Sequence, residues 1–270
     1  MGQQTKIQWA DHTFNPWIGC TKVSDGCRNC YAEAQDRRRG HESWGPGALR
    51  RVTSAANWRT PLRWAKAAEL AGERRRVFCA SLADVFDAEA PEGALDALWR
   101  LIRETPALDW LLVTKRPERI ATSLPVGWGE GWPNVWLGTS VENQAAAEAR
   151  LPHLLSVPAV VHFASVEPLL GPVDLFPWML PGWKANSSLD WPIVGGESGG
   201  VLARYCELSW VRRVVRDAKM AGVAVFVKQL GARAVVAPGT LLELRDSKGG
   251  DLTEWPADLQ VRELPRRRAA

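Results

Sequence analysis

Three of the five cysteines in this chain lie within eleven positions, at Cys20, Cys27 and Cys30. Six residues separate the first from the second, and two separate the second from the third. With this spacing, the close pair can converge on one metal centre while the first cysteine returns over a loop. A structural zinc site is normally closed by four protein ligands, whereas a catalytic centre keeps one position open. Three thiolates are one ligand short of a closed site.

The residues around these cysteines resemble the cluster loop of radical SAM enzymes. They begin with Asn15-Pro-Trp-Ile-Gly-Cys20 and end with Cys30-Tyr-Ala-Glu33. This is similar to the branch whose loop begins Asn-Pro-aromatic-x-Gly-Cys and ends Cys-Tyr-Ala. Three extra residues precede Cys27 compared with the usual radical SAM spacing. In this expanded spacing the chain is similar to a phage- and prophage-associated three-Cys-motif family.

The resemblance implies a 4Fe-4S cluster held by Cys20, Cys27 and Cys30, with S-adenosylmethionine chelating the fourth iron. In radical SAM enzymes, reductive cleavage of S-adenosylmethionine gives methionine and a 5′-deoxyadenosyl radical. The cofactor carries this chemistry, while the protein orients it and excludes solvent. The resemblance also implies a flavodoxin- or ferredoxin-like protein as the reductant.

Size and composition place bounds on the fold. The 270 residues suit one large α/β domain, because a (βα) barrel commonly needs about 250 residues. A hydrophobic fraction of 46% and a charged fraction of 24% are those of an ordinary globular protein, which excludes a disordered chain. The sequence has no run of about 18 apolar residues and no apolar stretch at its N-terminus, so we expect a cytoplasmic protein. Clustered cysteines in that compartment indicate metal or redox chemistry rather than disulfides.

Short apolar segments that end in polar residues recur along the chain, with 25 to 32 residues between successive polar ends. These segments are residues 77–84, 110–117, 135–142, 160–167, 193–197 and 223–229. Helical patterns lie between them, as at 91–105, 143–155 and 209–221. Strands that alternate with helices predict a parallel sheet, either open and doubly wound or closed as a barrel. We expect an α/β fold, a (βα) barrel or partial barrel of about six to seven βα units.

The regular alternation stops after Gly231. We therefore expect residues 1–231 to form the partial barrel, with the cysteine-rich loop at 15–33 and an irregular insertion at 40–60. Residues 232–270 predict a small β-rich, hairpin-like extension with a disordered basic tail at its end.

In a parallel barrel, the active site lies at the carboxyl ends of the strands. Polar residues follow each predicted strand, and we divide them by expected role. The expected contacts for the cofactor are Asp84, Ser140, Glu142 and Glu197. The expected catalytic residues are Glu167, Lys228 and Lys115, and Thr114 and Arg116 are further candidates for binding a substrate or a carboxylate. Radical SAM proteins usually carry Gly-Gly-Glu at the second strand, whereas here it stands at Gly195–Glu197, at the end of the fifth apolar segment that follows the cysteine loop.

Two other functions agree with parts of the sequence. A glycosidase-like barrel hydrolase would use two of Glu142, Glu167 and Glu197 as acid and base, with tryptophans as sugar platforms. A nonenzymatic zinc module would bind nucleic acid through arginine runs, which otherwise form solvated helix faces. These runs are 37–39, 74–76, 212–213 and 266–268. Fifteen tryptophans and a net charge of +4 favour a nucleic acid or nucleobase as the substrate, and the residues equally allow a protein or peptide.

Overall fold

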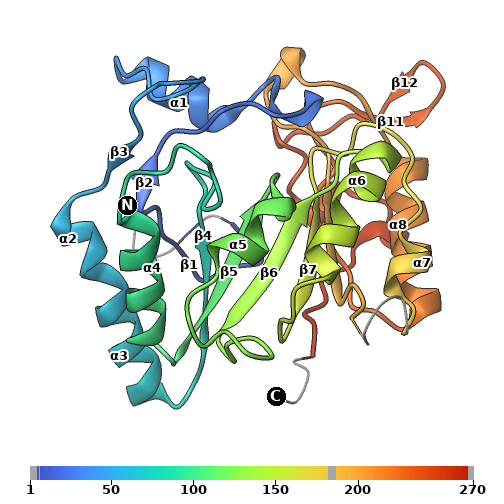
Figure 1. The fold of residues 1–270 in the computed structure, drawn as a ribbon. Coiled ribbons are helices and arrows are strands. Elements are labelled where there is room, and N and C mark those ends of the chain that lie inside the picture. Colours follow the sequence, from blue (N-terminus) through green and yellow to red (C-terminus); the bar gives the residue numbers. More distant parts are fainter. Residues whose placement is uncertain (1–4, 6, 182–186, 267–270) are drawn as a thin grey trace. The chain divides into compact units, whose positions relative to one another are not determined.

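The computed structural model describes residue 5 and residues 7–181 and 187–266 (Figure 1). It divides into two compact units, which are described separately. Among the described residues, the first unit runs to Gly138 and includes Pro158–Val160. The second comprises Thr139–Val157 and the chain from Val161 onwards.

Parallel strands form the centre of the first unit. The strands β1 (His12–Thr13), β4 (Arg75–Cys79), β5 (Leu108–Thr114) and β6 (Val135–Ser140) are neighbours in this order, and the last two residues of β6 are counted in the second unit. Leu108, Trp110, Leu111 and Leu112 of β5 are fully buried. Successive side chains point to opposite faces of a strand, so both faces of β5 are covered, as expected for a parallel strand with a continuous apolar run.

Helices precede and follow these strands. They are α1 (Tyr31–Arg38), α2 (Ala55–Trp58), α3 (Thr60–Ala71), α4 (Ala94–Arg103) and α5 (Ile120–Ser123), with 3-10 turns at Asp25–Cys27 and Pro117–Arg119. Pro61 lies in the first turn of α3, and Gly72 ends that helix in a left-handed conformation with φ 65°. These residues are typical start and stop signals.

The second unit repeats the alternation. Its strands β7 (His162–Val166), β8 (Trp191–Gly195) and β10 (Phe226–Gln229) pair in parallel. Its helices are α6 (Gln144–Leu155), α7 (Phe176–Met179) and α8 (Leu208–Ala221). A small sheet combines β9 (Cys206–Glu207), β11 (Ala234–Ala237) and β12 (Thr240–Leu241), and 3-10 turns lie at Gly200–Leu202, Leu252–Glu254 and Ala257–Leu259.

Seven parallel strands thus alternate with helices, and the predicted partial (βα) barrel is confirmed. The start of the chain does not form one continuous strand. Phe14, Asn15 and Pro16 separate β1 from β2 (Trp17–Ile18), and β2 pairs with β3 (Arg51–Val52) in a separate antiparallel ribbon. Pro16 has no N–H for a sheet ladder, which explains the interruption. The insertion at 40–60 therefore carries β3 and α2.

Residues 234–241 form the hairpin β11–β12. Of the predicted basic tail, 267–270 lie outside the described residues. Within the described residues, no helix is long and apolar enough to cross a membrane.

Candidate functional site

The cysteine loop begins at the carboxyl end of β4. Gly19 N–H donates to the Leu82 carbonyl at 3.0 Å, and Gly19 forms a parallel bridge with Ala83. This places Cys20 beside the residues that follow β4. Gly19 has φ 123°, and a Cβ atom there would lie 2.4 Å from the Ser43 carbonyl oxygen. Only glycine fits both the conformation and the space.

The other two cysteines lie further along the same loop. Cys27 ends a 3-10 turn, and Cys30 directly precedes α1. Cys20, Cys27 and Cys30 are all half-buried free thiols. Lys22, between the first two cysteines, forms a 2.6 Å ion pair with Glu33 of α1. This ion pair thus connects the cysteine loop to the helix that follows it.

A buried arginine ties the cysteine loop to two other segments. The Arg50 side chain has no exposed surface and donates to Thr21 Oγ1 at 2.6 Å. It also forms ion pairs with Asp87 at 2.9 Å and Glu89 at 2.5 Å. Its remaining donors bind the carbonyls of Gly45 and Ala48. Arg50 therefore fixes the residue next to Cys20.

Asp84 organises a second network at the ends of β4 and β5. Its carboxylate accepts hydrogen bonds from Thr114 Oγ1 at 2.7 Å, from the Lys115 backbone N–H at 3.0 Å and from Arg116 Nη1 at 2.9 Å. Asp84, Thr114 and Arg116 are all buried. A buried charge must be paired and hydrogen-bonded to be tolerated, and this pair meets both conditions.

Arg116 connects this network to Cys20, the first cysteine of the loop. Its Nη1 lies 3.6 Å from Cys20 Sγ, and its Nη2 donates to the Thr21 carbonyl at 2.7 Å. Burial raises the pKa of the Cys20 thiol to about 12, Asp84 adds to the rise, and Arg116 opposes it. Cys20 is therefore a thiol at neutral pH, and a bound metal would have to displace its proton.

The donor set suits an iron-sulfur cluster, because iron in such clusters is held by soft thiolates. Among the described residues, however, no three Cys, His, Asp or Glu side chains are grouped closely enough to hold a metal ion. Side chains of the Cys20–Cys30 loop would have to turn toward one another to bind one. The chemistry of the donors thus fits, and the coordination geometry is not formed.

In the second unit, each predicted glutamate has a cationic partner. Glu142 pairs with Arg150 at 2.7 Å, and Arg150 also donates to the Ser140 carbonyl at 2.8 Å. Glu167 pairs with Lys228 at 3.1 Å, as two of the predicted catalytic residues. Glu197 binds Arg204 through both its carboxylate oxygens, with distances of 2.5 and 3.0 Å.

Comparison with known proteins gives a family for this chain. Residues 4–256 match a family model described as a protein of unknown function, DUF5131. The chain belongs to the DUF5131 family. No curated protein matches it.

Two solved structures resemble this DUF5131 chain. A cysteine-to-serine mutant of spore photoproduct lyase is 15% identical, with a TM-score of 0.48, over 72% of this chain and 59% of that one. Spore photoproduct lyase complexed with dinucleoside spore photoproduct is 14% identical, with a TM-score of 0.47, over 71% and 57%. The DUF5131 chain thus spans less than two thirds of the length of those structures. The predicted likeness to the phage three-Cys-motif family stays a prediction.

The fold of this DUF5131 protein brings part of the predicted set together. Cys20, Asp84, Thr114 and Arg116 form one network, and Lys115 joins it through its backbone N–H. The residues Ser140, Glu142, Glu167, Glu197 and Lys228 belong to the second unit. Arg50 is not evident from the sequence, because it stands in a stretch without periodicity and its partners Asp87 and Glu89 follow a different strand.

Proposed function

We propose that this DUF5131 protein is a radical SAM-type iron-sulfur enzyme. The observation that carries the proposal is the position of the cysteine loop, which begins where β4 ends, within a set of parallel strands that alternate with helices. In α/β folds of this kind, reactive groups gather at the carboxyl ends of the strands. A bound 4Fe-4S cluster would supply the electron that cleaves S-adenosylmethionine.

The residues of this chain would hold and orient that cluster. Cys20, Cys27 and Cys30 would supply the three thiolates. Arg116 would keep a cationic N–H donor against the sulfur of Cys20, and Asp84 would keep Arg116 in place. Hydrogen bonds to cluster sulfurs are one of the means by which a protein sets a reduction potential.

The roles of the remaining residues stay predictions. Predicted contacts for S-adenosylmethionine are Asp84, Ser140, Glu142 and Glu197, and predicted catalytic or substrate contacts are Glu167, Lys228 and Lys115. Asp84 is already engaged by Thr114, Lys115 and Arg116, which supports a positioning role for it instead. A flavodoxin- or ferredoxin-like reductant, a nucleic acid or nucleobase substrate and a cytoplasmic location complete the proposal.

Anaerobic reconstitution with iron and sulfide tests the proposal. We expect a brown protein with about four irons per chain and reductive formation of 5′-deoxyadenosine from S-adenosylmethionine. Changing Cys20, Cys27 or Cys30 to Ala should remove most of the iron. Cys79→Ala and Cys206→Ala are matched controls, because these two cysteines are buried outside the loop and should leave iron loading unchanged. An iron-free protein under these conditions would contradict the proposal.

The two alternatives receive less support. A glycosidase needs one carboxylic acid that can give up a proton and one carboxylate. Here Glu142, Glu167 and Glu197 each form an ion pair. A structural zinc site needs a fourth ligand beyond the three cysteines of the loop. Stoichiometric zinc in a colourless protein would favour that alternative.

A further inference from the structure

A cavity of about 850 Å³ lies in the first unit beside the cysteine loop. Residues Glu33, Asp36 and Arg37 of α1 form one part of its wall, and residues of the 40–51 segment form the other. Ligand pockets are typically about 300 to 1,000 Å³ in volume, so the cavity is large enough for a nucleotide. The backbone of Trp44, a lining residue, forms an isolated parallel β-bridge with Cys20, and Gly45 N–H donates to the Cys20 carbonyl at 3.0 Å.

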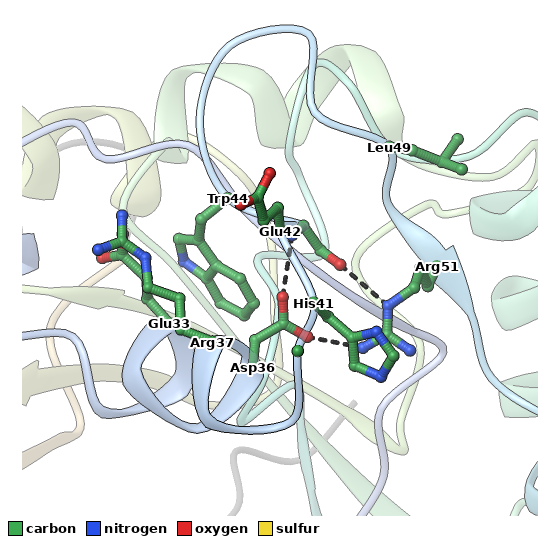
Figure 2. A pocket seen from close by; sticks show the side chains of 10 residues that line it. Glu33, Asp36, Arg37, His41, Glu42, Trp44, Leu49 and Arg51 are labelled. Atoms are coloured by element: carbon green, nitrogen blue, oxygen red, sulfur yellow. Dashed lines mark hydrogen bonds and ion pairs between the residues drawn. The ribbon is translucent and has the colours of Figure 1, made fainter.

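One side of this cavity is held rigidly. The Asp36 carboxylate accepts from Ser43 N–H at 2.9 Å and from Arg51 Nη2 at 2.6 Å. Arg51 Nε also donates to Ser43 Oγ at 3.0 Å. These contacts satisfy Asp36 and Arg51, so both support the wall and neither is left as an uncompensated charge. Figure 2 shows the Trp44 indole between this network and the side chain of Arg37.

Other groups in the cavity lining have hydrogen-bonding capacity left for a ligand. Within the part of the chain that the structure describes, the Trp44 indole N–H, the His41 ring and the Glu42 carboxylate make no hydrogen bond or ion pair with the protein. Trp44 and His41 are half-buried and Glu42 is exposed. A flat aromatic face with nearby donors and acceptors is the set of groups that holds a planar heterocycle by stacking and by hydrogen bonds to its edge.

A basic run adjoins the cavity. Arg37 lines it with a side chain that is 72% exposed, and Arg38 and Arg39 follow it in the chain, directly before the lining residue Gly40. All three arginines are exposed. Arg37 forms one ion pair, with Glu33. A guanidinium has five N–H donors, so this ion pair does not use all of them. Such a run suits the phosphates that flank a bound base.

We propose that this cavity binds an unpaired base of single-stranded nucleic acid, stacked on Trp44, with the neighbouring phosphates on Arg37–Arg39. A carboxylate accepts hydrogen bonds from an exocyclic amino group, so Glu42 favours cytosine over thymine. A base within a duplex is not available for stacking on a protein ring, so double strands bind more weakly. The proposal deepens the proposed function by giving its substrate class, and binding can be measured apart from the iron chemistry.

Fluorescence anisotropy with labelled ten-nucleotide oligo-dC and oligo-dT tests the proposal on the full chain. Trp44→Ala should weaken oligo-dC binding by roughly tenfold or more, because stacking contributes strongly per base. Trp44→Phe keeps a smaller ring and should lose less. Arg37→Glu with Arg39→Glu should weaken binding of both oligonucleotides and reduce its salt dependence. Arg100→Glu on α4, another exposed arginine, is the charge control and should leave binding close to wild type.

The preference for cytosine that we assign to Glu42 is tested separately. Glu42→Ala should remove the preference for oligo-dC over oligo-dT and leave the binding of oligo-dT unchanged. Equal binding of the two by the wild-type protein would overturn that role. Unchanged binding by Trp44→Ala, or equal binding of a duplex, would overturn the cavity as the site.

Two further measurements test the same site. If Trp44→Ala does not fold, photocrosslinking of the wild-type protein to an oligonucleotide with a photoreactive base should label residues within 40–51. Labelling elsewhere alone would overturn the proposal. The iron content of the same preparation is measured separately, so an iron-free protein that still binds through Trp44 contradicts the proposed function and not this inference.

Discussion

Arg116 and Cys20 are 96 positions apart in the chain, yet Arg116 Nη1 lies 3.6 Å from Cys20 Sγ. The same Nη1 atom donates to the Asp84 carboxylate at 2.9 Å, and Asp87 lies 3.7 Å from Nη2. The first cysteine of the loop is therefore packed against a fixed cation whose own charge is balanced by two carboxylates. Burial alone lowers the pKa of Arg116, but Asp84 and the other partners outweigh it and raise that pKa. Arg116 thus stays charged.

The first prediction concerns the reactivity of Cys20 in metal-free protein. The thiolate is the form that reacts with iodoacetamide, and the pKa of Cys20 is raised to about 12. We expect its alkylation rate to rise about tenfold per pH unit from pH 7 to pH 10, without a plateau. Arg116→Gln removes a group that lowers this pKa, so the rate at each pH should fall. Mass spectrometry of the Cys20 peptide measures the rate.

Cys206 is the internal control for this experiment. It is fully buried, so its alkylation reports unfolding and not thiol chemistry. A plateau in the Cys20 rate below pH 9, with Cys206 unreacted, would contradict the prediction.

The second prediction concerns the energetic coupling of Arg116 and Asp84. Arg116→Gln leaves the buried Asp84 without its cation, and breaking a buried ion pair in this way costs about 3 to 5 kcal/mol. Adding Asp84→Asn to the Arg116→Gln variant removes the unpaired negative charge. We therefore expect the double variant to be destabilised by clearly less than the sum of the two single variants, by about 0.5 to 3 kcal/mol. Urea unfolding measures all four proteins, and strict additivity would show that the pair is not coupled.

The third prediction concerns Arg50, which joins the cysteine loop to the 45–48 segment and to Asp87. Arg50→Met keeps the length of the side chain and removes all its hydrogen bonds. We expect a loss of about 3 kcal/mol in the free energy of unfolding. Faster deuterium exchange in 19–22 and 43–51 should accompany it. Arg50→Lys keeps the positive charge but lacks the planar guanidinium. Its free energy of unfolding should therefore lie between those of wild type and Arg50→Met.

Arg245→Met is the matched control for Arg50. Arg245 also pairs with a glutamate, Glu254, but its side chain is 88% exposed. Solvent screens an exposed ion pair, so this variant should unfold close to wild type. Equal losses for Arg50→Met and Arg245→Met would contradict the role given to Arg50.

Much of the fold could be predicted because buried parallel strands leave a clear pattern. The apolar run of β5 predicts a strand because a strand covered on both faces needs no polar residue. In the segment 77–84 the strand covers only the apolar start, since β4 ends at Cys79 and the chain then forms turns around Asp84. Polar residues after a strand predict the active-site end of a sheet, which is how Asp84, Thr114 and Arg116 were found.

The support around the cysteine loop could not be predicted in this way. Arg50 binds Asp87 across 37 positions, and its side chain is buried although it stands in a stretch rich in Gly, Ser and Pro. No periodicity marks such a residue, because its burial depends on contacts that form only after the strands have paired. The cavity lined by Trp44 lies in the same stretch, which the sequence predicted only as an irregular insertion.

The fourth prediction concerns Asp36, which holds the cavity wall together. Burial raises the pKa of its carboxyl, but the hydrogen bonds from Ser43 and Arg51 outweigh burial and hold that pKa below the ordinary value of 3.8. In the unfolded chain the group titrates near that ordinary value. Its stabilising contribution is therefore complete above about pH 4 and is lost as the pH falls through the folded-state pKa.

Asp36→Asn should accordingly lower the free energy of unfolding at pH 6 to 7, and the difference from wild type should shrink below about pH 4. Arg51→Gln removes one of the groups that lower the folded-state pKa of Asp36, so the loss of stability in acid should be smaller in this variant and complete at a higher pH than in wild type. Urea unfolding between pH 3 and pH 7 measures both effects. A constant difference between Asp36→Asn and wild type across this range would mean that the Asp36 carboxylate does not hold the wall by its charge.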